Sequence, residues 1–360
     1  MSFEEIENKQ VNKILLFGKK IFPYLRSLTG SGTYKTLIEI QKHIPKLKIN
    51  FFKSGSKVFD WTVPPEWNIK EAYLLDHNNK KLLDIKNNNL HIVNPSKKIN
   101  QFLTFGELKK NLHYLKTRPA AIPYVTSYYK KNWGFCLSYN YYKKLEKYYS
   151  HKNSNKKIKV VINSSFNPNG KMNFGEVYIK GKFKEEILIS TNICHPQMAN
   201  NELSGPMCSI LLYNYFKKKK NLKSIRFVFL PETIGSIAYL SKNLKTLKKN
   251  VYGGYVLSCI GDNRNYTYLK TKNCKSNSDK AALKTIKDCR IKARIKSFLI
   301  DRGSDERQYN SPGIDLNIGG IMRTMFRDYR EYHTSDDNFN LVTSKGIQGG
   351  YNFSKKIIEL

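Results

Sequence analysis

Residues 187–205 read ILISTNICHPQMANNELSG, and this stretch decides the fold class. Its first seven residues lack the regular alternation of apolar and polar side chains, so they predict a strand covered on both faces. A helical pattern follows at Gly205–Lys218. The same order of strand and helix recurs further along the chain, at Ile225–Leu230, Ile237–Leu244, Tyr252–Cys259 and Asp279–Cys289. The sequence therefore predicts an α/β domain built on a largely parallel sheet with helices on both faces.

The segments before this core predict a small inserted domain. Residues 1–50 have apolar side chains at helical spacing, with helices expected at Val11–Leu28 and Thr33–Ile44. Residues 55–115 change to short β-type runs separated by prolines and Asn-rich turns. We expect the α/β domain to comprise residues 1–54 and 116–360, interrupted by a small β-rich domain at 55–115. Two further local predictions are a helix at Leu103–Leu115 and a hairpin of Lys157–Asn163 with Gly175–Lys182.

The charge of the chain comes mostly from lysine. The net charge is +35, and of the 63 Lys and Arg residues only eleven are Arg. Two interpretations remain open: a solvated Lys- and Asn-rich surface, or a polyanionic partner such as nucleic acid, acidic polysaccharide or anionic membrane. Surfaces that read bases usually rely on Arg, so we expect no specific nucleic acid partner. The run Lys217–Lys220 follows a predicted helix, where the helix dipole favours cations.

Cysteine usage and hydropathy indicate the compartment. The six cysteines are scattered without a CxxC pair, and the first residues lack the apolar run of a secretory signal. No window approaches 18 consecutive apolar residues, so no membrane span is expected. Apolar residues make up 40% of the chain, which is enough for a buried core and excludes wholesale disorder. We expect a cytoplasmic protein with reduced thiols, and homo-oligomerisation remains open.

Chemically active side chains follow the predicted strands. His195, Glu232 and Asp262 each come just after a strand, and His333 precedes the last predicted helix, Ile347–Leu360. In open α/β sheets, ligands bind beyond the carboxyl ends of the strands. Two imidazoles and one carboxylate with an open position are a hydrolytic zinc ligand set, and a further Glu can accept a proton from water. The alternative is structural: single histidines pack in cores, Asp262 makes a turn, and Glu232 favours a helix N-terminus.

Longer motifs carry a resemblance to a known family. They are RSLTGSGTYKTL (26–37), VFDWTVPPEWNI (58–69), NLHIVN (89–94), IPYVTSYYKKNWGFCLS (122–138), HPQMANNELSG (195–205), PETIGSIAYL (231–240), RGSDERQYNSPGIDLNIG (302–319) and EYHTSDDNF (331–339). With these motifs, the chain resembles the aminopeptidase-like domain proteins of bacterial polysaccharide biosynthesis loci, within the zinc aminopeptidase superfamily. The resemblance implies a three-layer α/β/α zinc-peptidase-like domain with a mixed, mostly parallel sheet and a small β-rich inserted domain.

The resemblance also implies roles for individual residues. His195, Asp262 and His333 match metal-ligand positions, and Glu232 matches the general base. Two positions depart from the superfamily pattern. Asn201 stands where an Asp bridges two metals, and Thr233 stands where a carboxylate ligand follows the base. Because an amide oxygen is an uncharged and weaker ligand, we expect one zinc ion, with the second site weak or empty.

Further residues are candidates for substrate binding. Acidic side chains suit a substrate ammonium and arginines suit a carboxylate, whereas Tyr332 beside His333 could support an oxyanion or merely pack. The candidates are Glu202, Asp305, Glu306, Arg302, Arg307, Arg323 and Tyr332. A buried ion-pair network that orders the loop is an equal alternative for the segment around Asp305.

Three functions are carried forward. The first is a metal-dependent amide hydrolase resembling an aminopeptidase, acting on a small peptide or on an aminoacyl or acyl amide, with Glu232 as general base. The second is a deacylase for an amino-sugar or aminoacyl-sugar in surface polysaccharide biosynthesis. The third is a non-catalytic binding protein on a degenerate peptidase fold, which Asn201 and Thr233 favour.

Overall fold

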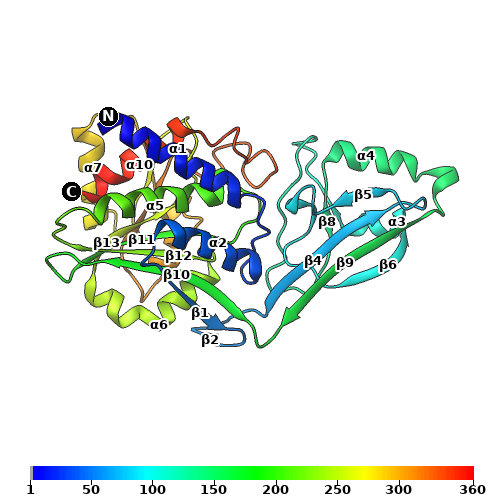
Figure 1. Ribbon diagram of the computed structural model, residues 1–360, viewed down its shortest axis with the longest axis horizontal. Coiled ribbons are helices and arrows are strands. Elements are labelled where there is room, and N and C mark those ends of the chain that lie inside the picture. Colours follow the sequence, from blue (N-terminus) through cyan, green and yellow to red (C-terminus); the bar gives the residue numbers. More distant parts are fainter. Residues whose placement is uncertain (1–2) are drawn as a thin grey trace.

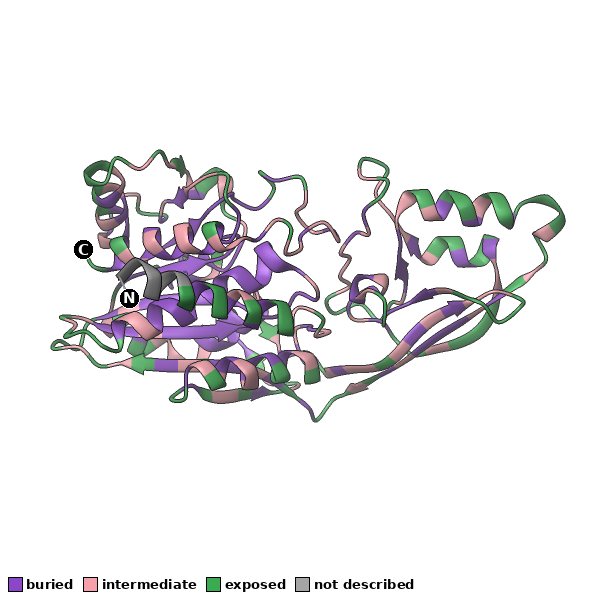
Figure 2. Cartoon of the chain, turned by 45° about the horizontal axis from the view of Figure 1, so that its top comes forward, coloured by how far each residue is buried: buried purple, intermediate pink, exposed green. Residues whose placement is uncertain are grey.

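The computed structural model describes residues 3–360, with side chains described from residue 9 onward. Residues 1 and 2, with which the predicted α/β domain begins, lie outside the described residues. The chain forms two lobes, a larger α/β lobe that holds the first and the last described helix and a smaller β-rich lobe (Figure 1). Buried residues are concentrated in the strands of the larger lobe (Figure 2).

The larger lobe is built on one mixed sheet. Its eight strands follow the spatial order β1 (Lys48–Lys53), β10 (Lys171–Ile179), β12 (Ser224–Leu230), β11 (Glu186–Asn192), β13 (Val251–Leu257), β16 (Ile318–Met322), β14 (Thr267–Leu269) and β15 (Arg294–Lys296). The four central strands from β12 to β16 are parallel, whereas β1, β10 and β14 run antiparallel to their inner neighbours. The prediction of a mixed, mostly parallel sheet is confirmed.

Helices cover both faces of this sheet (Figure 1). One face carries α1 (Phe3–Ile21), α2 (Ser31–His43), α5 (Ser204–Phe216), α7 (Asn277–Asp288) and α10 (Ser344–Ile358). The other face carries α6 (Ile234–Asn250) and the short α9 (Glu306–Tyr309). A further short helix, α8 (Phe298–Asp301), precedes α9. This arrangement is the expected three-layer α/β/α architecture.

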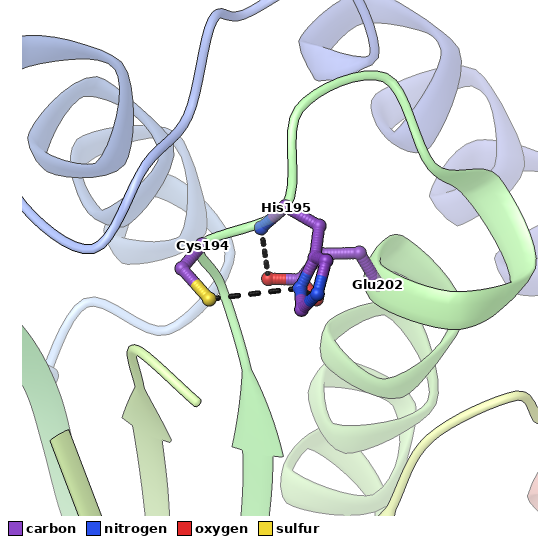
Figure 3. Close-up of side chains that lie close together, drawn as sticks. All are labelled: Cys194, His195 and Glu202. Atoms are coloured by element: carbon purple, nitrogen blue, oxygen red, sulfur yellow. Dashed lines mark hydrogen bonds and ion pairs between the residues drawn. The ribbon is translucent and has the colours of Figure 1, made fainter. Parts of the chain in front are cut away.

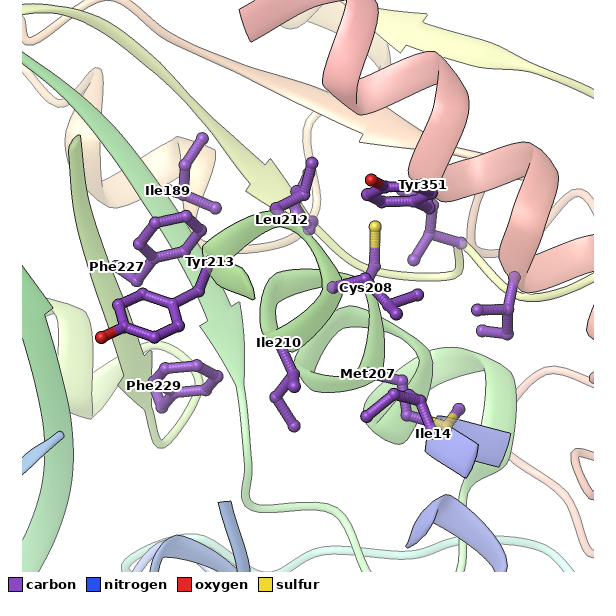
Figure 4. Close-up of a cluster of buried hydrophobic side chains, with 14 of the residues drawn as sticks. Ile14, Ile189, Met207, Cys208, Ile210, Leu212, Tyr213, Phe227, Phe229 and Tyr351 are labelled. Carbon is purple, nitrogen blue, oxygen red and sulfur yellow. The ribbon is translucent and has the colours of Figure 1, made fainter. Parts of the chain in front are cut away.

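The alternation of strand side chains separates two cores. Ile189 and Phe227 face α5 and join a cluster with Met207, Cys208 and Leu212 (Figure 4). Their chain neighbours Leu188 and Val228 point the other way and join a second cluster with residues of α6, as does Val256 on β13. Because successive strand residues point to opposite faces, both faces of a central strand must be apolar. Helix α5 is buried along nearly its whole length, as its apolar sequence predicts.

The smaller lobe is built on a second, antiparallel sheet. Its strands follow the order β5 (Lys81–Asp84), β4 (Glu66–Leu75), β9 (Lys157–Asn167) and β6 (Ile99–Thr104). The segment between α2 and β9 also contains the helices α3 (Phe105–Leu108) and α4 (Tyr139–Tyr148) and the 3₁₀ turns η1 (Asn89–His91), η2 (Lys109–Asn111) and η3 (His151–Asn153). Its short strands are β2 (Lys57–Val58), β3 (Trp61–Thr62), β7 (Leu112–His113) and β8 (Phe135–Cys136). Strand β9 lies beyond residue 115, so this sheet extends past the boundary expected from the sequence.

Two local predictions are wrong. Strands β9 and β10 do not form a hairpin, because the turn between them sends β9 to the smaller sheet and β10 to the larger one. The helix expected at Leu103–Leu115 ends after one turn at Leu108, because the next residues form a 3₁₀ turn and then pair as β7 with β8. In addition, α1 ends at Ile21, earlier than expected. None of the helices in residues 3–360 is both long and apolar enough to cross a membrane.

Candidate metal centre

Three segments bring the predicted site residues to the carboxyl ends of the central strands. His195 follows β11, and Glu232 follows β12. A π-helical turn at Ala199–Leu203 leads into α5 and carries Asn201. His333 comes from the loop before α10, in a backbone conformation with φ of 55°. We use the term metal centre for His195, Asn201, Glu232 and His333.

His195 is oriented by Glu202. The carboxylate of Glu202 accepts the backbone N–H of His195 at 2.8 Å through Oε1 and lies 2.8 Å from the ring Nδ1 through Oε2 (Figure 3). Because a carboxylate only accepts, Nδ1 carries a proton, and a metal would have to bind through Nε2. Burial alone would lower the pKa of His195, but Tyr124 and the Glu202 carboxylate raise it overall, so a metal at Nε2 would displace a proton from the ring.

His333 lies beside His195, with its Nε2 hydrogen-bonded to Asn201. The two ring centroids are 5.3 Å apart, and Nε2 of His333 is 3.1 Å from Oδ1 of Asn201. Burial lowers the pKa of His333 well below its usual range, with the neighbouring His195 and Arg327 acting in the same direction. His333 is therefore neutral near pH 7, which is the form of imidazole that binds metals.

Glu232 presents one carboxylate oxygen to the imidazoles. Its Oε2 is 3.6 Å from Nε2 of His195. Its Oε1 accepts hydrogen bonds from Asn192 Nδ2 at 3.1 Å and Ser304 Oγ at 2.7 Å. The carboxylate is thus held in place by one oxygen while the other remains available for a proton.

Asp262 does not share this site, contrary to the expectation from the sequence. Its Oδ1 accepts from the Arg264 backbone N–H at 2.9 Å and from Thr324 Oγ1 at 2.7 Å. Its Oδ2 accepts from the Thr324 backbone N–H at 2.9 Å and from Asn200 Nδ2 at 3.2 Å. Four hydrogen bonds occupy the carboxylate, and among residues 3–360 none of its contacts involves either imidazole. The position after β13 that contacts Asn201 is instead Cys259, with Sγ 3.8 Å from Nδ2.

The two residues that depart from the superfamily pattern offer no second carboxylate. Asn201 contacts His333 through its amide oxygen. Thr233 adopts φ of 65° and donates its backbone N–H to Asp305 at 2.7 Å. The expectation of one metal and a weak or empty second site therefore stays a prediction.

The predicted substrate-binding residues divide into buried and accessible ones. Glu202 is buried behind His195, and Asp305 is buried with Oδ1 bonded to the Thr233 N–H and the Ser236 hydroxyl. Both therefore position the site and leave no surface for a substrate. Arg307 is exposed, and the ring of Tyr332 stacks on His333 with centroids 3.9 Å apart.

Three further residues complete the centre, and sequence reasoning gave them no role. Tyr124, from the smaller lobe, places its ring 4.9 Å from His195 and 5.1 Å from His333. Asp337 accepts the N–H groups of the first three residues of the π-helical turn and so fixes Asn201. Buried Arg26 donates to the His195 carbonyl at 2.8 Å. All three lie in motifs quoted above, which was the only signal available.

The donor set fits one zinc ion. Two imidazoles that share a tetrahedral ion have ring centroids roughly 5 Å apart, as those of His195 and His333 are. Cys194, His195 and Glu202 also cluster closely enough to hold a metal. However, burial raises the pKa of Cys194 to about 12, and its Sγ accepts the Glu232 N–H at 3.2 Å. His195, His333 and the amide oxygen of Asn201 are therefore the groups that would hold a metal ion here.

Comparisons with known proteins agree with this architecture. A Clostridium acetobutylicum protein named as a polysaccharide biosynthesis protein with aminopeptidase-like domain is 42% identical over 340 residues, which cover 94% of this chain and 75% of that protein. The crystal structure of a peptidase from Clostridium acetobutylicum matches with a TM-score of 0.92 at 40% identity, covering 98% of this chain and 81% of the other. A zinc aminopeptidase from Bacillus subtilis matches with a TM-score of 0.68 at 12% identity, covering 98% and 94%.

The last of these matches shows a shared fold, and the first two show close relatedness. The family model described as a domain of unknown function, DUF4910, matches residues 16–360, which is nearly the whole chain. The chain therefore belongs to the DUF4910 family and has the α/β fold of zinc aminopeptidases.

Proposed function

We propose that this protein is a metal-dependent amide hydrolase in which Glu232 is the general base. The observation that carries the proposal is the convergence of His195, His333 and Glu232 at one end of the sheet. A zinc ion held by the two imidazoles and Asn201 would polarise a carbonyl and lower the pKa of water. The names of the relatives and the fold support a hydrolase of this type.

The residues of the chain supply the remaining steps. Glu232, held through Oε1 by Asn192 and Ser304, accepts the proton of the attacking water on Oε2. The same carboxyl then returns that proton to the leaving nitrogen as the amide bond breaks. Glu202 holds His195 in the tautomer that binds metal. The rings of Tyr124 and Tyr332 pack against the imidazoles and restrict access of water.

A deacylase acting on an amino-sugar or aminoacyl-sugar is the second candidate, and one observation favours it. Glu202 and Asp305, which were expected to bind a substrate ammonium, are both buried and bonded within the protein. A small cleft of about 10 Å³ beside His195 and Glu232 is lined by no other carboxylate. A substrate with an acylated nitrogen needs no ammonium site, whereas an aminopeptidase substrate does. The name of the Clostridium acetobutylicum relative, which mentions polysaccharide biosynthesis, also favours a sugar substrate.

The substitution Glu232→Gln tests the proposal. We expect it to lower amide hydrolysis by roughly 10²- to 10⁴-fold, because the amide cannot accept a proton. Metal content should remain at the wild-type value, since Glu232 is not a ligand. Turnover is measured on two panels, aminoacyl p-nitroanilides and N-acyl amino-sugars, which separate the two candidate functions.

A matched control is Glu185→Gln, which removes an exposed carboxylate next to the opposite end of β11. It should leave turnover unchanged. Equal activity of Glu232→Gln and wild type on a substrate that the wild type hydrolyses would remove Glu232 from the mechanism. Absence of metal and of turnover on both panels would favour the non-catalytic alternative.

A further inference from the structure

A second pocket opens beside the cleft at the metal centre, between the two lobes. It has a volume of about 290 Å³. It shares two lining residues, Leu28 and Tyr128, with the cleft that contains His195 and Glu232. Its lining also includes Thr29, Trp67, Tyr129, Lys130 and Lys131. A group in this pocket can therefore be part of a molecule whose reacting bond lies at the metal centre.

The wall of this pocket offers rings and prolines, and most of its polar atoms are already bonded. Thr29 Oγ1 accepts the Trp67 backbone N–H at 2.9 Å and donates to the Pro65 carbonyl at 3.2 Å. The Ser27 hydroxyl donates to the Thr29 carbonyl. The Trp67 indole donates to Ser96 at 2.9 Å, and the Tyr129 hydroxyl donates to Thr62 at 2.5 Å. A guest gains little hydrogen bonding from such a wall, which therefore suits an apolar, ring-sized group.

The charges at the rim of the pocket are positive. Lys130 and Lys131 are exposed and form no ion pair with any described residue from 9 to 360. The lining of the pocket contains no acidic residue. A ligand with a carboxylate or phosphate gains attraction here, whereas one with an ammonium is repelled.

We propose that this pocket binds the apolar ring of an anionic amide substrate, with the negative group of that substrate beside Lys130 and Lys131. The inference rests on the proposed amide hydrolysis for the position of the scissile bond. Two sources share this chemistry: an amide that also carries a free arylacetate group, which presents an aromatic ring and a carboxylate, and an N-acylated acidic amino-sugar, which presents the apolar face of its ring. The rings and the two lysines of this pocket would thus select the class of substrate.

The test measures binding without turnover. The full chain is treated with a chelator, so that no metal competes for the probe, and titrated calorimetrically with phenylacetate, acetate, phenylacetamide and glucuronate. We expect phenylacetate or glucuronate to bind about tenfold or more tightly than acetate, because a ring is buried. Phenylacetamide should bind more weakly than phenylacetate and without salt dependence, because it lacks the charge. Tighter binding of glucuronate than of phenylacetate would identify an acidic sugar as the source.

Variants locate the binding in this pocket. Tyr129→Ala, at a side chain that is 43% exposed, should weaken ring binding about tenfold. The double substitution Lys130→Gln with Lys131→Gln should abolish the salt dependence. The control Tyr34→Ala removes a tyrosine that is 45% exposed on α2, outside the pocket lining, and should change nothing.

Two results would overturn the inference. One is equal affinity for phenylacetate, glucuronate and acetate. The other is ring binding that is unaffected by both pocket variants. Because the titration needs neither metal nor Glu232, its failure would leave the hydrolase proposal standing. Conversely, if the protein hydrolysed no amide, the binding measured in this pocket would still stand.

Discussion

At the scale of single residues, the two histidines of the metal centre differ in their neighbours, because only one of them contacts a carboxylate through the turn that precedes α5. Glu202 contributes its carboxylate behind His195, whereas Asn201, beside His333, contributes only an amide. The adjacent side chains thus point to different histidines, as expected for successive residues in a helical turn. We therefore expect Glu202 to orient His195 and not to supply the carboxylate that position 201 lacks.

The substitution Asn201→Asp should strengthen metal binding. A carboxylate adds negative charge where a neutral oxygen now lies 3.1 Å from His333 Nε2. We expect the dissociation constant for zinc, measured by competition with a chromophoric chelator, to fall by about tenfold or more, equivalent to about 1.4 kcal/mol. The control Asn250→Asp adds the same charge at the end of α6 and should have no effect. An unchanged constant in Asn201→Asp would mean that Asn201 is not a ligand.

Asp305 should make the stability of the protein depend on pH. Burial raises its pKa to about 8, with the charge of Glu232 acting in the same direction, whereas an Asp in the unfolded chain titrates near about 4. The folded state binds the proton of Asp305 more tightly than the unfolded state, so protonation of Asp305 stabilises the fold. This stabilisation is fully present below about pH 4 and is lost as the pH rises to about 8. Asp305→Asn keeps an acceptor for Thr233 and does not titrate.

We therefore expect the difference in unfolding free energy between wild type and Asp305→Asn to change across this range. Wild type should lose stability relative to the variant by up to about 1.4 kcal/mol per pH unit. Urea denaturation at several pH values from 4 to 9 measures the two curves. Parallel curves for the two proteins would show that folding does not raise the pKa of Asp305.

At the scale of elements, α5 approaches the sheet so closely that its first turn tolerates no side chain at Gly205. A Cβ there would lie 2.1 Å from Thr191 Oγ1 and 2.4 Å from the Leu257 carbonyl oxygen. Both neighbours belong to β11 and β13, so neither can move without disturbing the sheet. This close approach also places the π-helical turn, and with it Asn201, over the strand ends.

Gly205→Ala should therefore be strongly destabilising. We expect a loss of more than about 2 kcal/mol in the free energy of unfolding, measured by denaturant titration, together with weaker metal binding. Gly106→Ala is the matched control, because the nearest atom to its Cβ would be 3.9 Å away. That variant should stay within about 0.5 kcal/mol of wild type. Similar stabilities for the two variants would contradict the close packing of α5.

The elements themselves were largely predictable, because β11, β12 and β13 are buried on both faces and their sequences lack polar alternation. The failed hairpin shows the limit of local patterns. Strands β9 and β10 are adjacent in the chain, and only their distant partners assign them to different sheets. The expectation that Asp262 lies beside the two histidines was wrong for a related reason. The residue does follow β13, but hydrogen bonds with Asn200 and Thr324 set the direction of its side chain.

At the scale of the whole molecule, the smaller lobe completes the centre. Its loop supplies Tyr124, whose backbone N–H donates to the His333 carbonyl at 2.8 Å. In the same loop, Arg118 forms an ion pair with Asp336, and Ile122 donates its N–H to Ser335 Oγ at 3.0 Å. These bonds hold the segment that carries His333. The inserted lobe is thus part of the site as well as a wall of the neighbouring pocket.

The run of four lysines after α5 has a local explanation. Helix α5 ends at Phe216, and the predicted cationic run Lys217–Lys220 follows it directly. Cations at this end interact favourably with the helix dipole. Weak, salt-sensitive binding to heparin or DNA is expected of any chain with net charge +35.

We expect His195 and His333 to hold one metal ion, and metal analysis of protein purified without chelators is the decisive experiment. Elemental analysis should find about one equivalent of zinc or a similar divalent ion per chain. His195→Ala and His333→Ala should each lose it, whereas the control His77→Ala, at an exposed histidine of the smaller lobe, should retain it. Wild-type protein that binds no metal after incubation with zinc, cobalt or manganese would contradict the account, as would metal retained in the double variant of His195 and His333.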